Sequence, residues 1–121
     1  MENLHDRVRW MDYKGTKILV VDFSGLKTGV EVKHVTDLSE KIHSAQPLRS
    51  VRRLTIARNT FFIEDARKVI AEYTPKILKY TIASASIGFT NRKAIIMKTI
   101  NPNMKDFETE EDAAEWLSQQ E

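Results

Sequence analysis

The stretch "RVRWMDYKGTKILVVDF", Arg7 to Phe23, decides how the rest of the chain is interpreted. Val8 and Trp10 alternate with charged residues, and "YKGT" supplies a turn that contains glycine. The run from Lys17 to Phe23 is apolar at successive positions, so both faces of this second strand are expected to be covered. The stretch therefore predicts a β-hairpin whose second strand is central in a sheet.

Beyond the hairpin, helices and strands are expected to alternate. Apolar spacing predicts helices over about 29–45, 63–73 and 91–100, with Pro75 marking the end of the second helix or a kink in it. Strands are expected over 51–57, 81–87 and 104–107, and "TEEDAAEWLSQQ" predicts a last helix that Thr109 caps. Strands that alternate with helices pair in parallel through crossover connections. The sequence thus predicts one α/β domain over 1–121, with a mixed sheet of four or five strands, an N-terminal hairpin and about four helices. The expected core residues are Ile18, Val20, Leu54, Ile56, Ala85, Ile87 and Ile95.

Composition narrows the classes of protein that need consideration. The chain has 121 residues, of which 41% are hydrophobic and 30% charged, the balance of a globular domain with one core. Cysteine is absent, which excludes disulfides, thiolate metal sites and a cysteine nucleophile. No apolar run approaches the roughly 20 residues of a membrane span, and the N-terminus lacks a hydrophobic signal segment. We therefore expect a cytoplasmic protein without a cofactor.

The charge is distributed unevenly along the chain. The net charge is only +2, but seven of the 17 acidic residues follow Lys105, where no Lys or Arg occurs. The rest of the chain is strongly basic, and it could attract nucleic acid, anionic lipid or an acidic protein. The alternative is that the acidic end neutralises the basic body across the fold.

Few residues suggest catalysis. His5, His34 and His43 are isolated in the sequence, and the last two are nine positions apart on one predicted helix, which does not suit a shared metal ion. Asp22 and Ser24 could form a catalytic pair, but an Asp that accepts backbone hydrogen bonds in the following turn explains the pattern as well. Because no catalytic triad, phosphate-binding loop or carboxylate pair is recognisable, an enzyme is not expected.

The order of four segments resembles the SpoIIAA-like family, also described as STAS/SEC14-domain-like proteins. The segments are "YKGTKILVVDFSGLK" (13–27), "QPLRSVRRLTIA" (46–57), "ASASIGFTNRKAIIMKTIN" (83–101) and "FETEEDAAEWL" (107–117). These are small bacterial domains, related in fold to anti-sigma factor antagonists and more remotely to lipid-binding CRAL-TRIO domains. The resemblance implies a noncatalytic module that binds a protein partner or a small ligand.

The resemblance also raises two specific expectations. In the antagonists, a serine in an Asp-Ser-Ser-Gly-like turn after the third strand is phosphorylated. The matching segment here is "ARNTFFIEDA", where Thr60 is the one hydroxyl and the Asp and Gly are missing, so Thr60 is interpreted as a helix cap. The CRAL-TRIO link suggests an apolar ligand pocket lined by Phe61, Phe62 and Phe89, for which core packing is the alternative.

Two further kinds of partner stay open. Arg49, Arg52, Arg53 and Arg58 surround one strand and suggest nucleic-acid binding, although the stacking aromatics of single-strand binders and a basic recognition helix are missing. A homodimer through an exposed sheet edge or helix face is the other.

The candidate ligand site lies in the turn from Gly88 to Lys93. This turn follows a parallel strand, at the carboxyl edge of the sheet where open α/β folds bind ligands. Arg92 and Lys93 stand at the start of a predicted helix, where the helix dipole disfavours cations by roughly 0.3–1 kcal/mol. A bound anion or acidic partner would remove this conflict. The predicted site residues are Gly88, Thr90, Asn91, Arg92 and Lys93.

Overall fold

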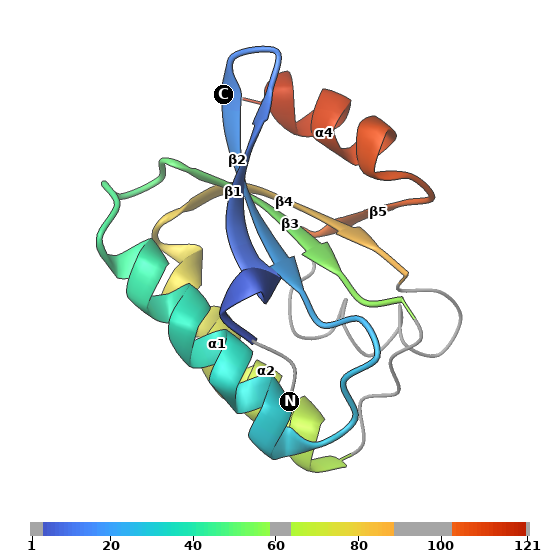
Figure 1. The fold of residues 1–121 in the computed structure, drawn as a ribbon. Coiled ribbons are helices and arrows are strands. Elements are labelled where there is room, and N and C mark those ends of the chain that lie inside the picture. Colours follow the sequence, from blue (N-terminus) through green and yellow to red (C-terminus); the bar gives the residue numbers. More distant parts are fainter. Residues whose placement is uncertain (1–3, 59–63, 89–102, 121) are drawn as a thin grey trace.

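The structure, a computed structural model, describes residues 4–58, 64–88 and 103–120. It contains one five-stranded sheet with the strand order β1-β2-β3-β4-β5 (Figure 1). β1 pairs antiparallel with β2, and every later neighbour pairs in parallel. The predicted α/β class and mixed sheet are therefore confirmed. The strands are β1 (Val8–Tyr13), β2 (Thr16–Asp22), β3 (Val51–Ile56), β4 (Thr81–Ile87) and β5 (Lys105–Phe107).

The hairpin between β1 and β2 is confirmed where the sequence places it. Tyr13 pairs with Thr16, and both turn residues have positive φ, 50° at Lys14 and 86° at Gly15. Two consecutive residues of positive φ are typical of a type I′ turn, whose twist matches that of the strands. The Asp12 carboxylate accepts a hydrogen bond of 2.9 Å from the Gly15 amide and closes the turn.

Helices cover both faces of the sheet. α1 (Gly29–Ser44) and α2 (Glu64–Leu78) lie side by side on one face, and α4 (Glu110–Ser118) lies on the other (Figure 1). A short 3-10 turn, η1 (Leu4–Arg7), which the sequence pattern does not predict, precedes β1. The predicted helix over 91–100 lies outside the described residues.

Capping side chains fix where two helices begin. Thr28 and Glu31 form a capping box at the start of α1, and the Asp65 carboxylate of α2 accepts a hydrogen bond of 3.1 Å from the Gly29 amide. Thr109 accepts a hydrogen bond from the Asp112 amide, which confirms it as the cap of α4.

Pro75 does not end α2, contrary to the expected end at about residue 73. The helix continues through it to Leu78. A proline inside a helix costs about 3 kcal/mol, because it removes a donor and crowds the preceding turn. Thr74 and Ile77 are both buried in this last turn, so burial of their side chains offsets the loss.

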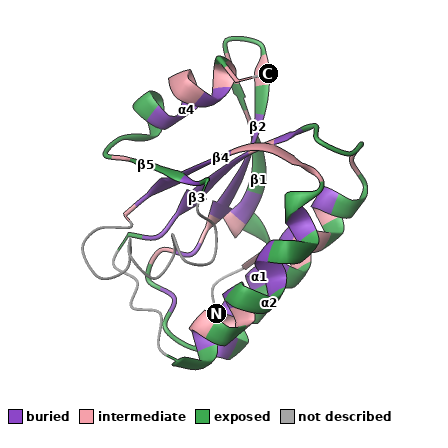
Figure 2. Cartoon of the chain, turned by 180° about the vertical axis from the view of Figure 1, so that it is seen from behind, coloured by how far each residue is buried: buried purple, intermediate pink, exposed green. Residues whose placement is uncertain are grey.

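The core has two parts, one on each side of the sheet (Figure 2). The α4 side contains six of the seven predicted core residues, all of them buried, whereas Ile95 lies outside the described residues. The α1/α2 side is a second cluster, built on Leu19, Val21 and Val51 together with Val32 and Val35 of α1. Both faces of β2 are therefore covered, as its unbroken apolar run predicts.

Candidate functional site

Gly88 stands at the carboxyl end of β4, where the sequence predicts the ligand site. Its φ is +92°, and an added Cβ would lie 2.8 Å from the carbonyl carbon and oxygen of Ala57. Glycine is thus required here because the end of β4 touches the end of β3. The other four predicted site residues, Thr90, Asn91, Arg92 and Lys93, lie outside the described residues, as do Thr60, Phe61, Phe62 and Phe89.

The described loops at this carboxyl edge are held together by their own hydrogen bonds. The Asp22 carboxylate accepts a hydrogen bond of 2.8 Å from the Ser24 amide. This is the bond within the following turn that the sequence pattern allows as the alternative to catalysis. Ser24 Oγ accepts from the Arg58 amide at 3.2 Å, and the Ser24 carbonyl accepts from the Arg7 guanidinium at 2.6 Å. The side chains of Asp22 and Ser24 therefore stabilise the loop between β2 and α1.

The four arginines proposed for nucleic acid do not form one surface, and the first of them, Arg49, is exposed in the connection that precedes β3. Arg52 points to the α4 side, where its guanidinium donates to the carbonyls of Leu117 at 3.1 Å and Gln120 at 2.7 Å. Arg53 is buried on the opposite side of the sheet. Arg58 lies at the carboxyl end of β3 and pairs with Glu110 at 3.8 Å. Arg52, Arg53 and Arg58 thus each have a different partner, in a different part of the fold.

Arg53 belongs to a buried polar cluster between β3 and the two helices α1 and α2. It donates to Tyr73 Oη at 3.2 Å, and Tyr73 Oη lies 2.6 Å from Ser39 Oγ. His43 Nδ1 lies 2.8 Å from the Ser39 carbonyl, which can only accept, so the neutral ring carries its proton on Nδ1. Burial, followed by the nearby charge of Arg53, lowers the pKa of His43 to about 4.

The remaining imidazoles are not isolated in space. The rings of His5 and His34 meet edge to face, with their centres 5.7 Å apart. Within the described part of the chain, no three side chains of the metal-ligating types gather around one point.

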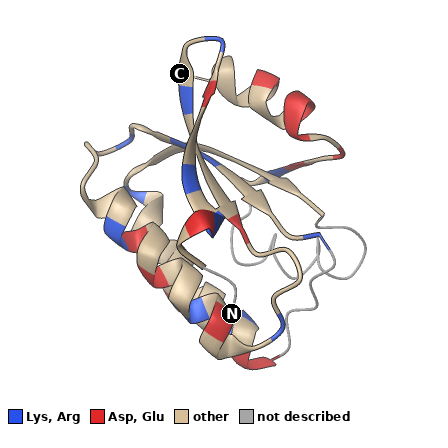
Figure 3. Ribbon diagram, viewed as in Figure 1, with Lys and Arg blue, Asp and Glu red and all other residues tan. Residues whose placement is uncertain are grey.

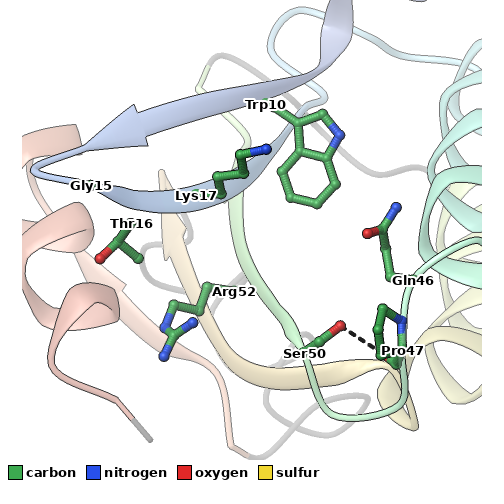
Figure 4. Close-up of a pocket in the computed structure, with 8 residues that line it drawn as sticks. All are labelled: Trp10, Gly15, Thr16, Lys17, Gln46, Pro47, Ser50 and Arg52. Atoms are coloured by element: carbon green, nitrogen blue, oxygen red, sulfur yellow. Dashed lines mark hydrogen bonds between the residues drawn. The ribbon is translucent and has the colours of Figure 1, made fainter.

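Two cavities, of about 340 and 390 Å³, open at the amino edge of the parallel strands, the edge opposite Gly88. The second borders the start of β4 and Asn103, which directly follows an undescribed segment. The first lies between the β1–β2 hairpin and the connection from α1 to β3, and we call it the hairpin pocket (Figure 4). It is lined by Trp10, Gly15, Thr16, Lys17, Gln46, Pro47, Ser50 and Arg52.

The hairpin pocket has one aromatic and cationic wall and one polar wall. Trp10 and Lys17 lie side by side on the hairpin, facing Gln46 and Ser50 (Figure 4). The Trp10 side chain is 43% exposed, although most large apolar residues of the described chain are buried. No ion pair joins Lys17 to any described carboxylate. On the polar wall, Ser50 Oγ donates a hydrogen bond of 2.6 Å to the Pro47 carbonyl.

Sequence reasoning did not select Trp10 as a functional residue. Its alternation with Arg9 places it on the same side as Val8, which is buried against the α1/α2 layer. The tip of the hairpin extends beyond that layer (Figure 1), and Trp10 stays 43% exposed. The exposure of Trp10 depends on how far the hairpin extends beyond α1 and α2. That distance is set by tertiary packing, and no local sequence pattern indicates it.

Comparison of the chain with protein-family models, curated proteins and solved structures finds no match. None of the described helices combines the length and the apolar character that crossing a membrane requires.

Proposed function

We propose that this protein is a noncatalytic binding or regulatory module of the STAS/SpoIIAA-like type, which takes an anionic group of a protein partner or small ligand in the hairpin pocket. The observation that carries the proposal is the exposed indole of Trp10 beside the Lys17 ammonium. An exposed aromatic next to a cation binds ligands that combine a planar or apolar part with negative charge. The order of the four sequence segments supports the family type.

The charges around the pocket favour an anion. Lys17 supplies an ammonium group, and the Gln46 amide, which gives one N–H to the Ile42 carbonyl at 3.3 Å, keeps a second N–H on the opposite wall. Asp12 is the cross-strand neighbour of Lys17, but it does not line the pocket, and its carboxylate is held in the hairpin turn by the Gly15 amide. Arg52 adds positive charge at the pocket margin while it is bound to the end of α4. A carboxylate or phosphate is the group that this arrangement neutralises best.

The noncatalytic character is supported by what three reactive groups of the described chain already do. Asp22 and Ser24 hold a loop through hydrogen bonds, and the bare Nε2 of His43 is buried among the helices. A base or nucleophile must reach a substrate to act on it. These groups therefore stabilise the scaffold.

Fluorescence of Trp10 tests the proposal directly. In a Trp116→Phe background Trp10 is the single indole, and we expect a hexaglutamate peptide or inorganic phosphate to change its emission, with hexalysine as the control peptide. Lys17→Glu should weaken this binding at least tenfold, whereas Lys68→Glu, an equal charge reversal on the exposed side of α2, should leave it unchanged. If neither anionic probe changes the emission, or both variants bind alike, the pocket is not an anion site.

The turn from Gly88 to Lys93 stays a separate prediction for the same class of function. Replacing Arg92 and Lys93 by Glu should abolish partner binding if this turn is the contact surface. Capture from a bacterial lysate followed by native mass spectrometry distinguishes the two surfaces. A partner lost only from Arg92→Glu/Lys93→Glu binds the turn, and a partner lost only from Lys17→Glu binds the hairpin pocket.

A further inference from the structure

β1 is a long sheet edge that no described element covers. Its six residues pair with β2 in one unbroken register, and it is the terminal strand in the sheet order. Proteins usually blunt such an edge with a proline, a bulge or a covering segment. β1 contains no proline and no register shift, and its charged residues are limited to Arg9 and Asp12. Its outer side therefore offers a template for another strand.

The hairpin turn determines which backbone groups of β1 face outward. In a two-residue hairpin the residues that flank the turn, here Tyr13 and Thr16, exchange hydrogen bonds with each other. Backbone groups alternate along an antiparallel strand, so every second residue from Tyr13 points toward β2. The N–H and C=O groups of Val8, Trp10 and Asp12 consequently point away from the sheet.

We propose that β1 pairs with β1 of a second copy of this chain, antiparallel about a two-fold axis at Trp10. This register sets Trp10 opposite the partner's Trp10, and Val8 opposite the partner's Asp12, so every outward group of β1 meets one of the other copy. Registers shifted along the strand leave outward groups unmatched. The two five-stranded sheets become one continuous sheet, as a two-fold isologous contact allows.

The side chains of β1 agree with this register. No like charges come directly opposite each other, because Arg9 lies across from the partner's Met11. Trp10, Met11 and Tyr13 are all partly exposed in the single chain and gain cover from the added strand. The two Trp10 side chains lie on the same face of the sheet, so the two hairpin pockets meet at the axis. The contact is small, and we expect a dimer that dissociates on dilution.

Sedimentation velocity with two Trp10 variants tests the proposal. Trp10→Pro removes an outward N–H that the single chain does not use, so the fold should survive, as it does for prolines on edge strands. Trp10→Phe keeps that N–H and serves as the matched control. We expect wild type and Trp10→Phe to dimerise as concentration rises, and Trp10→Pro to associate at least tenfold more weakly. A wild type that is monomeric up to about 0.5 mM, or a Trp10→Pro that dimerises normally, overturns the proposal.

Amide hydrogen exchange of the wild type, read by NMR, does not depend on any variant folding. The amides of Val8, Trp10 and Asp12 should become protected as concentration rises, whereas those of Met11 and Tyr13 should be protected throughout. A dimer in which the first three amides stay unprotected uses another surface. Lys17 lies on β2 and takes no part in the pairing of β1 with β1, so Lys17→Glu should leave the dimer intact, and failure of anion binding and failure of dimerisation are distinguishable.

Discussion

Gly88 shows how a single residue can be determined by the backbone around it. Its positive φ disfavours any side chain, and a Cβ would strike the Ala57 carbonyl, which β3 holds in place. We expect Gly88→Ala to lower the free energy of unfolding by about 2–4 kcal/mol. Gly25→Ala is the matched control, because Gly25 has a φ of +75° with open space around it, and it should cost only about 1–2 kcal/mol. Equal losses in urea denaturation would show that the contact with β3 is unimportant.

His43 gives a prediction about pH. Its folded pKa of about 4 lies below the ordinary value of 6.5, so between these values the unfolded chain binds a proton that the folded chain rejects. The contribution of neutral His43 to the free energy of unfolding is therefore fully present above about pH 6.5. It is lost as the pH drops toward 4, and the loss from this residue is about 2–3 kcal/mol. His43→Gln should flatten that part of the curve of unfolding free energy against pH.

The imidazole NMR signals of the wild type provide the second readout for this prediction. His43 should remain neutral at pH 5.5 while the protein is folded. If its ring titrates near 6.5, or if His43→Gln keeps the wild-type dependence on pH, burial beside Arg53 does not control this residue.

Among the elements, α2 shows the limit of reasoning from sequence. Its existence follows from apolar spacing, but its end does not, because Pro75 is a strong local signal that burial of Thr74 and Ile77 outweighs. The same limit applies to the arginines around β3. Arg53 lies on the face opposite Leu54, as the alternation of side chains along a strand requires, but whether an arginine meets water, a helix end or a tyrosine depends on the element packed against it.

Arg52 connects two elements, and its loss should loosen α4. Its two hydrogen bonds satisfy carbonyls at the carboxyl end of α4, where a cation also complements the helix dipole. Arg52→Met should lower the free energy of unfolding by about 1–2 kcal/mol and increase amide exchange in the last turn of α4. Arg9→Met, an exposed arginine on β1, is the control and should change neither. Unchanged exchange at Leu117 in Arg52→Met would contradict this role.

For the whole molecule, the sequence predicted the class, the hairpin and one of the two core layers. The six confirmed core residues all face α4, because the prediction followed one side of each strand. The residues of the α1/α2 layer alternate with them, so a sheet covered on both faces uses every position of β2. The hairpin pocket depends on how far the hairpin extends beyond its helices, a quantity that no local pattern contains.

The uneven charge of the chain is partly resolved by the fold itself. One end of α4 lies beside the tip of the hairpin (Figure 3), where Glu115 lies 3.5 Å from Lys14 and accepts a hydrogen bond from Tyr13. Together with the pair of Arg58 and Glu110, these contacts favour neutralisation across the fold, as the sequence allowed.

Both ion pairs are exposed, so their effect should be small and sensitive to salt. Replacing Glu110 and Glu115 by Gln should lower the Tm by about 1–3 °C in dilute buffer and by less in about 1 M NaCl. Glu72→Gln/Glu108→Gln removes the same charge from exposed positions without these contacts, and should leave the Tm nearly unchanged. If the two double variants melt alike at both salt concentrations, the acidic helix is not held by its charges, and its carboxylates stay available to a basic partner.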